Sequence, residues 1–377
     1  MQTSVGPPDV VVSPDELRLR TVLRSELVAD RAAFLDTVLP GSERKINYPL
    51  IGPGVSENGE QTVPIDAPHG FNLGAAVMPA GVVNNLHLHF TAEVFTCMAG
   101  SWTFRWGTNG THEATVSEGD VISIPTWIFR GFTSDTDDAW LYTALGRDNS
   151  GGLIWAPRVI AEAAKCGSFL SVDGRLIRVE PGQIPEGVEL VRPLAEEELA
   201  SLPDVTLEEM RLRLAKPADL TWSAVPFLDS GLPGGGAELA LVVGYGVSED
   251  RFQRPRLTDP HGLALAWIRM DIGTGVGMHR HDASQVLIVK QGRMRITLNE
   301  MAEVSVTLGP YDVLSIPAGA WRRFEGIDED PALAVVITGG DGRTLLEWHP
   351  SVVAAARQDG IAIDADGYRA PAHLVRA

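Results

Sequence analysis

Apolar and polar residues alternate along many short segments of this chain, and such alternation is typical of β-strands with one buried face. The clearest segments are residues 71–78, 87–98, 102–106, 114–116 and 121–124. Glycines and a Thr-Asn-Gly turn separate them, as expected between neighbouring strands. Many short strands joined by turns predict a closed antiparallel jelly roll.

The N-terminal region has a helical pattern instead. Ser13 precedes Pro14 and two acidic residues, which is the composition of a helix start with an N-cap, a first-turn proline and acids near the positive end of the helix dipole. Apolar positions at helical spacing then continue to about Leu39. We therefore predict a helical N-terminal arm.

Further helices are predicted at 156–165, before Gly167, and at 350–358, before Gly360, because glycine commonly follows the last helical turn. Residues 181–219 contain two acidic helical patterns, at 194–202 and 207–214. We interpret this segment as a linker that packs two barrels or two subunits together.

One motif occurs twice. The pattern Gly81-x5-His87-x-His89-x3-Glu93-x6-Gly100 recurs 192 residues later as Gly273-x5-His279-x-His281-x3-Gln285-x6-Gly292. Two histidines separated by one residue share a strand face, and a carboxylate four residues later can join them on the returning strand. Imidazole with carboxylate suits iron, manganese, nickel, copper or zinc.

The repeat extends beyond this motif. At the same offset the chain repeats Pro68-His69-Gly70 as Pro260-His261-Gly262, Asp120 as Asp312, Pro125 as Pro317, and Arg130 as Arg322. A period this long indicates two whole domains rather than a solenoid, whose units are about 20–50 residues long.

These landmarks resemble the two consensus motifs of the cupin superfamily in a two-domain, or bicupin, arrangement. The first motif is complete in the first unit, and the second appears as Gly119-x5-Pro125. The resemblance implies an all-β fold of two tandem cupin (double-stranded β-helix, jelly-roll) barrels, with a helical N-terminal arm, a helical linker and a C-terminal helix. The expected divisions are an arm at 1–60, a cupin domain at 61–167, a linker at 168–220 and a second cupin domain at 221–377. The barrels themselves are expected at 62–145 and 263–337.

The chain departs from the cupin pattern at positions that bear on chemistry. The family's fourth ligand, a histidine of the second motif, is replaced by Arg130 in the first unit and Arg322 in the second. In the second unit, Gln285 also stands in place of the glutamate, and Tyr311 in place of a glycine.

In the first unit, we predict that His87, His89 and Glu93 hold a metal ion. A shell of two histidines and one carboxylate leaves coordination positions open, as in iron(II) oxygenases. Arg130 has two interpretations. It either offers a bidentate fork to a carboxylate or phenolate oxygen of a substrate beside the metal, or it pairs with Glu93 or a nearby aspartate and silences the site.

Other residues are weaker candidates. We assign Trp127 to the catalytic group with Arg130, since its ring could border a pocket for a planar substrate. His69 and His261 are the other duplicated histidines. They are candidate auxiliary acids, bases or replacement ligands, although we favour a structural role in the Pro-His-Gly turn.

The second unit is a candidate second metal site formed by His279, His281 and Gln285. The neutral amide of Gln285 should lower its metal affinity. Arg322 and Arg323 make this unit either a candidate anion pocket or a vestigial site. The segments around His279 and around Pro125 are similar to parts of gentisate-type ring-cleaving dioxygenases, which bind iron through histidines alone.

Composition excludes other classes of function. The formal net charge is −18, which disfavours nucleic acids and anionic membranes as partners. Cys97 and Cys166 are the only cysteines, too few for a disulfide framework, so we expect a reducing, cytoplasmic setting. The N-terminus has no signal-peptide pattern, and no segment reaches membrane-spanning length.

The sequence thus favours a metal-dependent bicupin, most plainly an iron(II) dioxygenase acting on a small anionic hydroxylated substrate, with an aromatic ring as one option. Fe(II) is the favoured cofactor, with manganese, nickel, copper and zinc as alternatives, and the expected assembly is a homo-oligomer. Two other interpretations stay open: a non-catalytic bicupin that binds a small acid through its arginines, and a cupin metalloenzyme that is an isomerase, decarboxylase or lyase.

Overall fold

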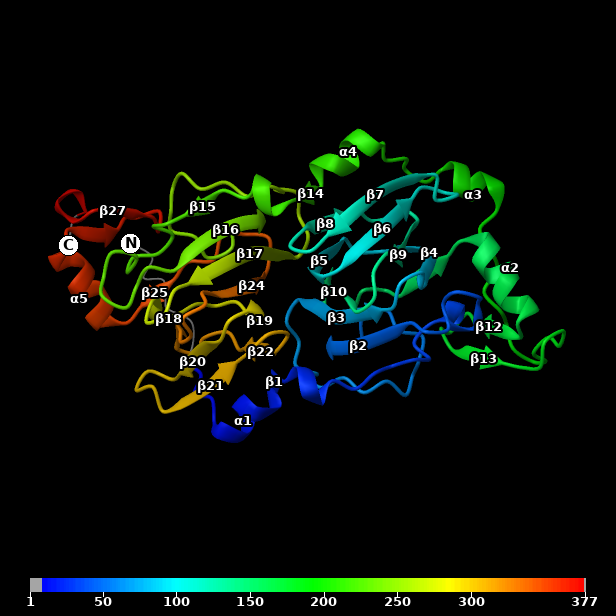
Figure 1. Cartoon of the computed structure of the whole chain (residues 1–377), viewed down its shortest axis with the longest axis horizontal. Helices are drawn as coiled ribbons and strands as arrows, with labels where there is room; N and C mark the ends of the chain where they lie inside the picture. Colours follow the sequence, from blue (N-terminus) through cyan, green and yellow to red (C-terminus); the bar gives the residue numbers. More distant parts are fainter. Residues whose placement is uncertain (1–8, 376–377) are drawn as a thin grey trace. The chain divides into compact units, whose positions relative to one another are not determined.

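A computed structural model describes residues 9–375 of the chain. The chain divides into two compact units. One is formed by residues 28–218, and the other by residues 1–27 together with 219–377. Each unit contains one β-barrel (Figure 1).

The first barrel has two antiparallel sheets. Its strands are β2 (Ile46–Ile51), β3 (Phe71–Met78), β4 (Val83–His89), β5 (Glu93–Ala99), β6 (Ser101–Trp106), β7 (His112–Ser117), β8 (Val121–Ile124), β9 (Arg130–Ser134), β10 (Ala139–Gly146), β11 (Leu153–Trp155) and β14 (Leu214–Ala215). One sheet has the order β14-β8-β5-β10-β3-β2, and the other has the order β11-β4-β9-β6-β7. The non-sequential neighbours are those of a jelly roll.

Alternation along β6 fills the core between these sheets, as the sequence predicts. Trp102, Phe104 and Trp106 are fully buried, whereas the residues between them are partly exposed. Phe95 of β5 meets Phe104 edge to face at a centroid distance of 4.9 Å, and such pairs contribute beyond the apolar area that they bury.

The second barrel repeats this plan. Its strands are β1 (Thr21–Val22), β15 (Trp222–Ser223), β16 (Glu238–Val243), β17 (Leu263–Met270), β18 (Gly275–Arg280), β19 (Gln285–Gln291), β20 (Met294–Leu298), β21 (Val304–Leu308), β22 (Val313–Ile316), β23 (Arg322–Gly326), β24 (Ala332–Gly339) and β25 (Glu347–Trp348). The sheet orders are β1-β22-β19-β24-β17-β16-β15 and β21-β20-β23-β18-β25. The predicted fold of two tandem jelly-roll barrels is confirmed.

Strand register identifies equivalent positions in the two barrels. Asn47 pairs with Ala76 in the first barrel, and Leu239 pairs with Ile268 in the second. Likewise, Asn84 pairs with Phe132, and Val276 pairs with Phe324. Each residue of a pair in the first barrel is 192 positions before the corresponding residue of the pair in the second barrel. The repeat in the sequence is therefore also a repeat in strand pairing.

The N-terminal helix is shorter than the prediction. Helix α1 (Pro14–Leu19) begins at the expected cap, where Ser13 Oγ accepts the Glu16 N–H at 3.1 Å. It ends at Leu19 because the chain then extends into β1, which pairs with β22 and buries Val22. Short 3-10 turns, η1 (Arg24–Glu26) and η2 (Leu35–Val38), follow instead of further helix.

The remaining helices lie close to their predicted positions. They are α2 (Pro157–Lys165), α3 (Glu196–Ala200), α4 (Leu207–Leu212) and α5 (Pro350–Gln358), with the 3-10 turns η3 (Pro217–Asp219) and η4 (Ala372–Leu374). Two small hairpins, β12 (Ser168–Leu170) with β13 (Leu176–Arg178) and β26 (Ile361–Ile363) with β27 (Arg369–Pro371), follow α2 and α5. Among the described residues, no helix combines the length and apolarity needed to span a membrane.

Candidate metal centre

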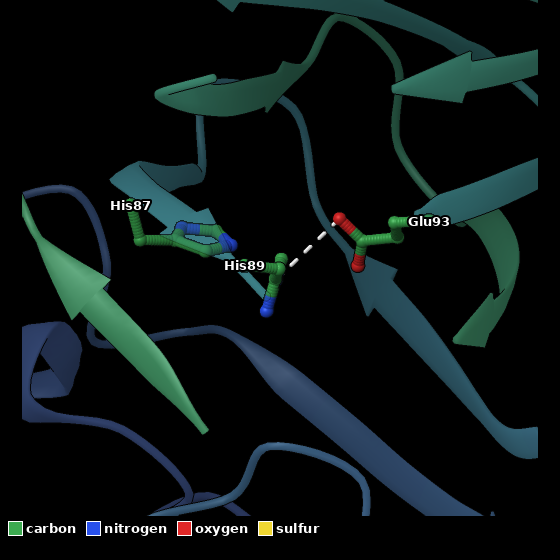
Figure 2. A group of neighbouring side chains, drawn as sticks. All are labelled: His87, His89 and Glu93. Carbon is green, nitrogen blue, oxygen red and sulfur yellow. Dashed lines mark ion pairs between the residues drawn. The ribbon is translucent and has the colours of Figure 1, made fainter. Parts of the chain in front are cut away.

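Three buried side chains meet where β4 ends and β5 begins. His87 and His89 lie at the C-terminal end of β4, on the same face of the strand, and Glu93 is the first residue of β5. One ligand atom from each lies within 4.8 Å of the others, and Figure 2 shows the two imidazoles and the carboxylate directed toward one another. Within residues 9–375, this is the group of three such side chains close enough to share a metal ion.

Hydrogen bonds leave the histidine Nε2 atoms available as ligands. His87 Nδ1 lies 2.7 Å from the Asn85 carbonyl oxygen. A carbonyl only accepts, so Nδ1 carries the proton and Nε2 keeps its lone pair. His89 Nδ1 similarly faces the Gly152 carbonyl at 3.5 Å, and its buried Nε2 has no hydrogen-bond partner among the described residues.

Burial also keeps both imidazoles neutral, which metal binding requires. Burial, followed by the nearby Arg130 charge, lowers the pKa of His87 to about 3 and lowers the pKa of His89 well below its usual value. Two neutral imidazoles with free Nε2 atoms and a carboxylate are a donor set suited to a divalent transition metal. The residues present therefore fit the metal that the sequence motif implies.

Arg130 lies beside this group. It is fully buried on β9, where it pairs with His87 in the strand register. Its Nε donates to Glu93 Oε2 at 3.1 Å and its Nη1 to the Ile128 carbonyl at 3.1 Å, whereas Nη2 is buried without a partner among the described residues. Of the two interpretations drawn from the sequence, pairing with Glu93 is the contact observed.

The hydrogen bond between Arg130 Nε and Glu93 Oε2 leaves Arg130 Nη2 without a partner among the described residues. The Arg130 charge and hydrogen bond lower the pKa of Glu93, but burial outweighs them and raises it to about 7. The site thus holds a buried carboxyl group whose pKa is raised by burial, and an arginine whose Nη2 has no hydrogen-bond partner among the described residues. An unsatisfied buried donor costs about 1–3 kcal/mol, which a bound oxygen acceptor would recover.

A cavity opens onto the three ligand residues. Its volume is about 110 Å³, several times the roughly 10–15 Å³ that one water molecule needs on the same scale. His87, His89 and Glu93 line it together with apolar groups and with amides of β2 and β4. It can hold a small organic molecule beside the ligand atoms.

The structure places Trp127 elsewhere. Trp127 follows β8, is 43% exposed and meets Phe90 edge to face at 5.1 Å. It does not belong to the described residues that line the cavity. Its φ of 65° is unusual for a bulky residue, and its N–H donates to the His89 carbonyl at 3.2 Å.

His69 and His261 hold turns. The backbone N–H of His69 donates to Asp148 Oδ1 at 2.8 Å, and its ring Nδ1 faces the Ala67 carbonyl at 2.5 Å. His261 repeats both contacts with Asp341 and Asp259 at 2.6 Å each. His69 is not among the residues that line the cavity of its barrel, and the contacts of both histidines are those of the turn role that we favoured.

In the second barrel, Arg322 lies among the residues that would bind metal. Its Nη1 is 2.9 Å from His281 Nε2 and 3.3 Å from Gln285 Oε1. Its Nε and Nη2 donate to the Ala320 and Pro317 carbonyls at 3.0 and 2.9 Å. Burial lowers the pKa of Arg322 to about 9, so it remains a cation at neutral pH.

This arrangement disfavours a second metal ion. The His281 lone pair is already engaged, Gln285 adds no negative charge, and a guanidinium repels another cation at this distance. His279 is buried, with Nδ1 2.7 Å from the Gly277 carbonyl. Successive strand residues face opposite sides, so Arg323 points away from the side on which Arg322 is buried. It is half exposed and pairs with Glu325 at 3.1 Å.

Buried polar groups behind the first site were missed by the sequence analysis. Trp155 contacts the His87 ring at a centroid distance of 5.4 Å and donates Nε1–H to Glu57 Oε1 at 2.7 Å. Lys45 donates to Asp36 and, at 2.8 Å, to Asn84 Oδ1. Lys45 and Asp36 are both fully buried.

Part of this group is duplicated, which is the signal that could have revealed it. Phe-Leu-Asp at 34–36 recurs at 227–229, and Ser-Glu at 56–57 recurs at 248–249. In the second barrel, Trp348 Nε1 donates to Glu249 Oε1 at 2.7 Å, as Trp155 does to Glu57. Lys45 has no such counterpart, because Ala237 occupies its position at the offset of 192.

Comparisons with known proteins agree with this architecture. The family described as cupin domain matches residues 266–338, which lie in the second barrel. No curated protein sequence matched the chain. A deletion mutant of oxalate decarboxylase from Bacillus subtilis matches in structure with 13% identity and a TM-score of 0.53, covering 97% of this chain and 87% of that one. The formate complex of oxalate decarboxylase from Lactobacillus farciminis matches with 13% identity and a TM-score of 0.52, covering 92% and 93%.

The fold is that of a bicupin. Because both structural matches cover nearly the whole chain, the likeness extends to the tandem arrangement and not only to the barrel matched by sequence. At 13% identity it concerns the fold alone. The particular resemblance to gentisate-type ring-cleaving dioxygenases stays a prediction.

Proposed function

We propose that this bicupin is a metal-dependent enzyme that acts on a small carboxylic acid in its first barrel. The observation that carries the proposal is the convergence of His87, His89 and Glu93 within 4.8 Å, buried and next to a cavity. His89 Nε2 supports it further, because it lies 3.5 Å from Glu93 Oε2 and makes no hydrogen bond among the described residues, and a native fold seldom leaves a buried ring nitrogen without a hydrogen bond.

In this proposal, His87, His89 and Glu93 hold one divalent metal. When bound, the metal would act as a Lewis acid toward substrate oxygens and, if it is iron, could also bind dioxygen. Arg130 is not among the described residues that line the cavity, but it adjoins Glu93, and in this proposal its unpartnered Nη2 would receive a substrate carboxylate. A guanidinium suits this role because it keeps its charge when buried and presents donors in a fixed plane.

Two reactions are candidates for this site. The first is the iron(II) dioxygenase activity suggested by the open shell of two histidines and one carboxylate. It would place both atoms of one dioxygen molecule in the product. The second is decarboxylation, favoured by the nature of the structural matches. It would break a carbon–carbon bond and release carbon dioxide without net consumption of an oxidant.

One experiment separates them. Protein loaded anaerobically with Fe(II) or Mn(II) is assayed for metal content, oxygen uptake and carbon dioxide release on a panel of small carboxylic acids that includes hydroxylated aromatic acids and oxalate. One dioxygen consumed per substrate supports the dioxygenase, and carbon dioxide release without net oxygen uptake supports the decarboxylase. Glu93→Ala should abolish either activity, whereas Gln285→Ala in the second barrel is the matched control.

The non-catalytic alternative makes a different prediction. If the protein only binds an acid through Arg130, acid binding should persist without metal, and no acid in the panel should be consumed with either metal. That result, together with a metal content near zero after loading, would overturn the proposal.

A further inference from the structure

Besides the three ligand residues, the cavity wall carries several polar side chains, among them Asn47 on β2 and Asn84 on β4. The other polar residues of the wall include Asp30, Ser56, Gln61, Asn72 and Thr143. The orientation of the Asn84 side chain is fixed by Lys45, which does not line the cavity. Lys45 Nζ lies 2.8 Å from Asn84 Oδ1, and because an ammonium only donates, the amide oxygen must face Lys45. The Asn84 NH₂ group is therefore turned away from Lys45.

Lys45 is held in place by Asp36. This ion pair is fully buried, and Asp36 Oδ2 also accepts the backbone and side-chain N–H groups of Asn85 at 3.0 and 3.1 Å. Lys45 itself is not among the residues that line the cavity. It therefore acts through Asn84 as a positioning residue and does not contact a ligand itself.

Asn47 supplies a second amide on the same wall. Its Nδ2 is buried and has no hydrogen-bond partner among the described residues. Asn72, which also lines the cavity, differs from it. The Asn72 amide donates to the carbonyls of Arg147 and Asp148 at 2.7 and 3.1 Å and accepts the Gly54 N–H at 2.9 Å, so its polar groups are already used in the fold.

The second barrel has apolar residues at the equivalent positions. Strand register equates Asn47 with Leu239 and Asn84 with Val276. Leu239, Val276 and Ala237, which takes the position of Lys45, all belong to the buried core of that barrel. The fold itself therefore does not need amides at these positions.

We infer that Asn47 and Asn84 form a second oxygen-binding subsite of the cavity, and that the substrate carries a second oxygen acceptor, a carbonyl or a carboxylate, besides the carboxylate at Arg130. The inference rests on the proposed function for the role of the first carboxylate. The wall also carries Asp30, whose carboxylate accepts from Asn58. The two amide donors recognise an acceptor group and reject a methyl group, which would leave the donors unpaired. The substrate class is thus short dicarboxylic acids, keto acids or their half-amides.

Calorimetry on the metal-loaded full chain tests this subsite. The probes are matched pairs of two to five carbons: oxalate and acetate, malonate and propionate, succinate and butyrate, glutarate and valerate. At one chain length at least, the diacid should bind about 10-fold or more tightly than the monoacid, as expected when buried donors gain or lose their acceptor. Half-amides of the same lengths then separate a requirement for negative charge from a requirement for an oxygen acceptor.

The variants Asn47→Leu and Asn84→Val copy the residues of the second barrel. Because Asn84→Val also removes an acceptor of the buried Lys45 Nζ, circular dichroism is used to check that the variants fold. Together they should reduce the preference for the diacid to about 1-fold while changing monoacid affinity less than about 3-fold, since only the second oxygen loses its partners. Asn109→Leu, an identical change at an exposed position, is the control and should keep the preference.

Lys45→Met tests positioning. It should weaken the diacid preference in the wild-type background and have no further effect in the Asn84→Val background, whereas a general loss of stability would reduce diacid and monoacid binding alike. If Lys45→Met does not fold, the two asparagine variants still decide the question.

The outcomes distinguish this inference from the proposed function. A diacid preference that survives in the Asn47→Leu/Asn84→Val double variant, or the absence of a preference at every chain length, overturns the subsite even if the protein binds metal and turns over a substrate. A preference that depends on the asparagines in a protein that binds no metal supports the subsite and contradicts the proposed enzyme.

Discussion

The two barrels present the same pair of histidines to different neighbours. In the first, His87 and His89 face a carboxylate and a cavity. In the second, His281 faces the Arg322 guanidinium and a glutamine amide, and the positions equivalent to the cavity amides are aliphatic. A shared backbone and a shared histidine motif therefore do not determine whether a barrel can bind a metal or a substrate.

The two buried arginines show how this difference arises. Arg130 has an anionic partner in Glu93 and keeps one unsatisfied N–H group. Arg322 has neutral acceptors for each of its three side-chain nitrogens. In the first barrel the arginine lies beside the candidate ligand Glu93. In the second barrel the arginine itself contacts His281 and Gln285, where a metal ion would otherwise lie.

The largest expected effect concerns metal content. Purified wild-type protein should contain about one tightly bound transition metal per chain, and Glu93→Ala should lose it, because the carboxylate supplies the only negative charge of the donor set. Gln285→Ala should retain it. Metal analysis by mass spectrometry provides the measurement, and equal occupancy of both barrels, or loss in Gln285→Ala alone, would reverse our ranking of the sites.

The second prediction concerns a double variant that gives the second barrel a metal-ligand set like that of the first. Gln285→Glu combined with Arg322→His removes the guanidinium and supplies an anionic ligand, so metal content should rise from about one to about two per chain. Arg322→Lys with Gln285→Glu is the control, since lysine keeps a cation at the site. A double variant that folds, as judged by circular dichroism, and still binds one metal would mean that other features exclude metal from this barrel.

The third prediction separates the two roles of Arg130. Arg130→Ala should weaken binding of a small acid to the metal-loaded protein by about 2–5 kcal/mol, the usual effect of removing one partner of a buried charged pair. Metal content should stay the same or increase, because a neighbouring cation has been removed. Arg130→Lys should bind the acid more tightly than Arg130→Ala but less tightly than wild type, since lysine lacks the planar guanidinium group. Acid affinity unchanged in Arg130→Ala, measured by calorimetry, would contradict a role in substrate binding.

The smallest effect concerns pH and the two buried carboxyl–tryptophan pairs. Burial raises the pKa of Glu57 to about 7 and that of Glu249 to about 8 in the folded protein, from 4.5. The folded state then binds each proton more tightly than the unfolded state, so the stabilisation is present below about pH 4.5 and is lost as pH rises through the folded-state pKa.

Urea denaturation of the full chain from pH 5 to pH 9 measures this loss. The free-energy difference between wild type and Glu249→Gln should keep changing up to about pH 8, whereas that between wild type and Glu57→Gln should level off near pH 7. Differences that do not vary with pH would show that neither carboxyl changes its protonation on unfolding.

The sequence predicted the barrels and the ligand cluster well because both follow from local periodicity. Strand alternation places His87 and His89 on one face, and the spacing to Glu93 closes the group whatever the rest of the chain does. The extension of the first helix to about Leu39 was wrong, because Thr21 and Val22 instead pair with β22 of the second barrel, almost 300 positions away. Helical spacing alone does not reveal such a distant partner.

The contacts of the arginines and the amides could not be predicted in the same way. Whether Arg130 reaches Glu93 or a substrate depends on a side-chain conformation, and the donor role of Asn84 depends on Lys45, which is 39 residues earlier in the chain. Buried charges such as Asp36 and Lys45 also contradict the general rule that charged residues are exposed. Only the repeated Phe-Leu-Asp and Ser-Glu segments gave a trace of them in the sequence.

The pairing of β1 with β22 has a consequence for synthesis of the protein on the ribosome. Residues 9–27 precede residues 28–218 in the chain, yet β1 pairs with a strand of the barrel that follows them. Domains generally fold in order as they emerge, so residues 28–218 can complete their barrel while this leading segment still waits for its partner. The second barrel thus closes only after residues 28–218 have been made, around a strand that precedes them in the chain.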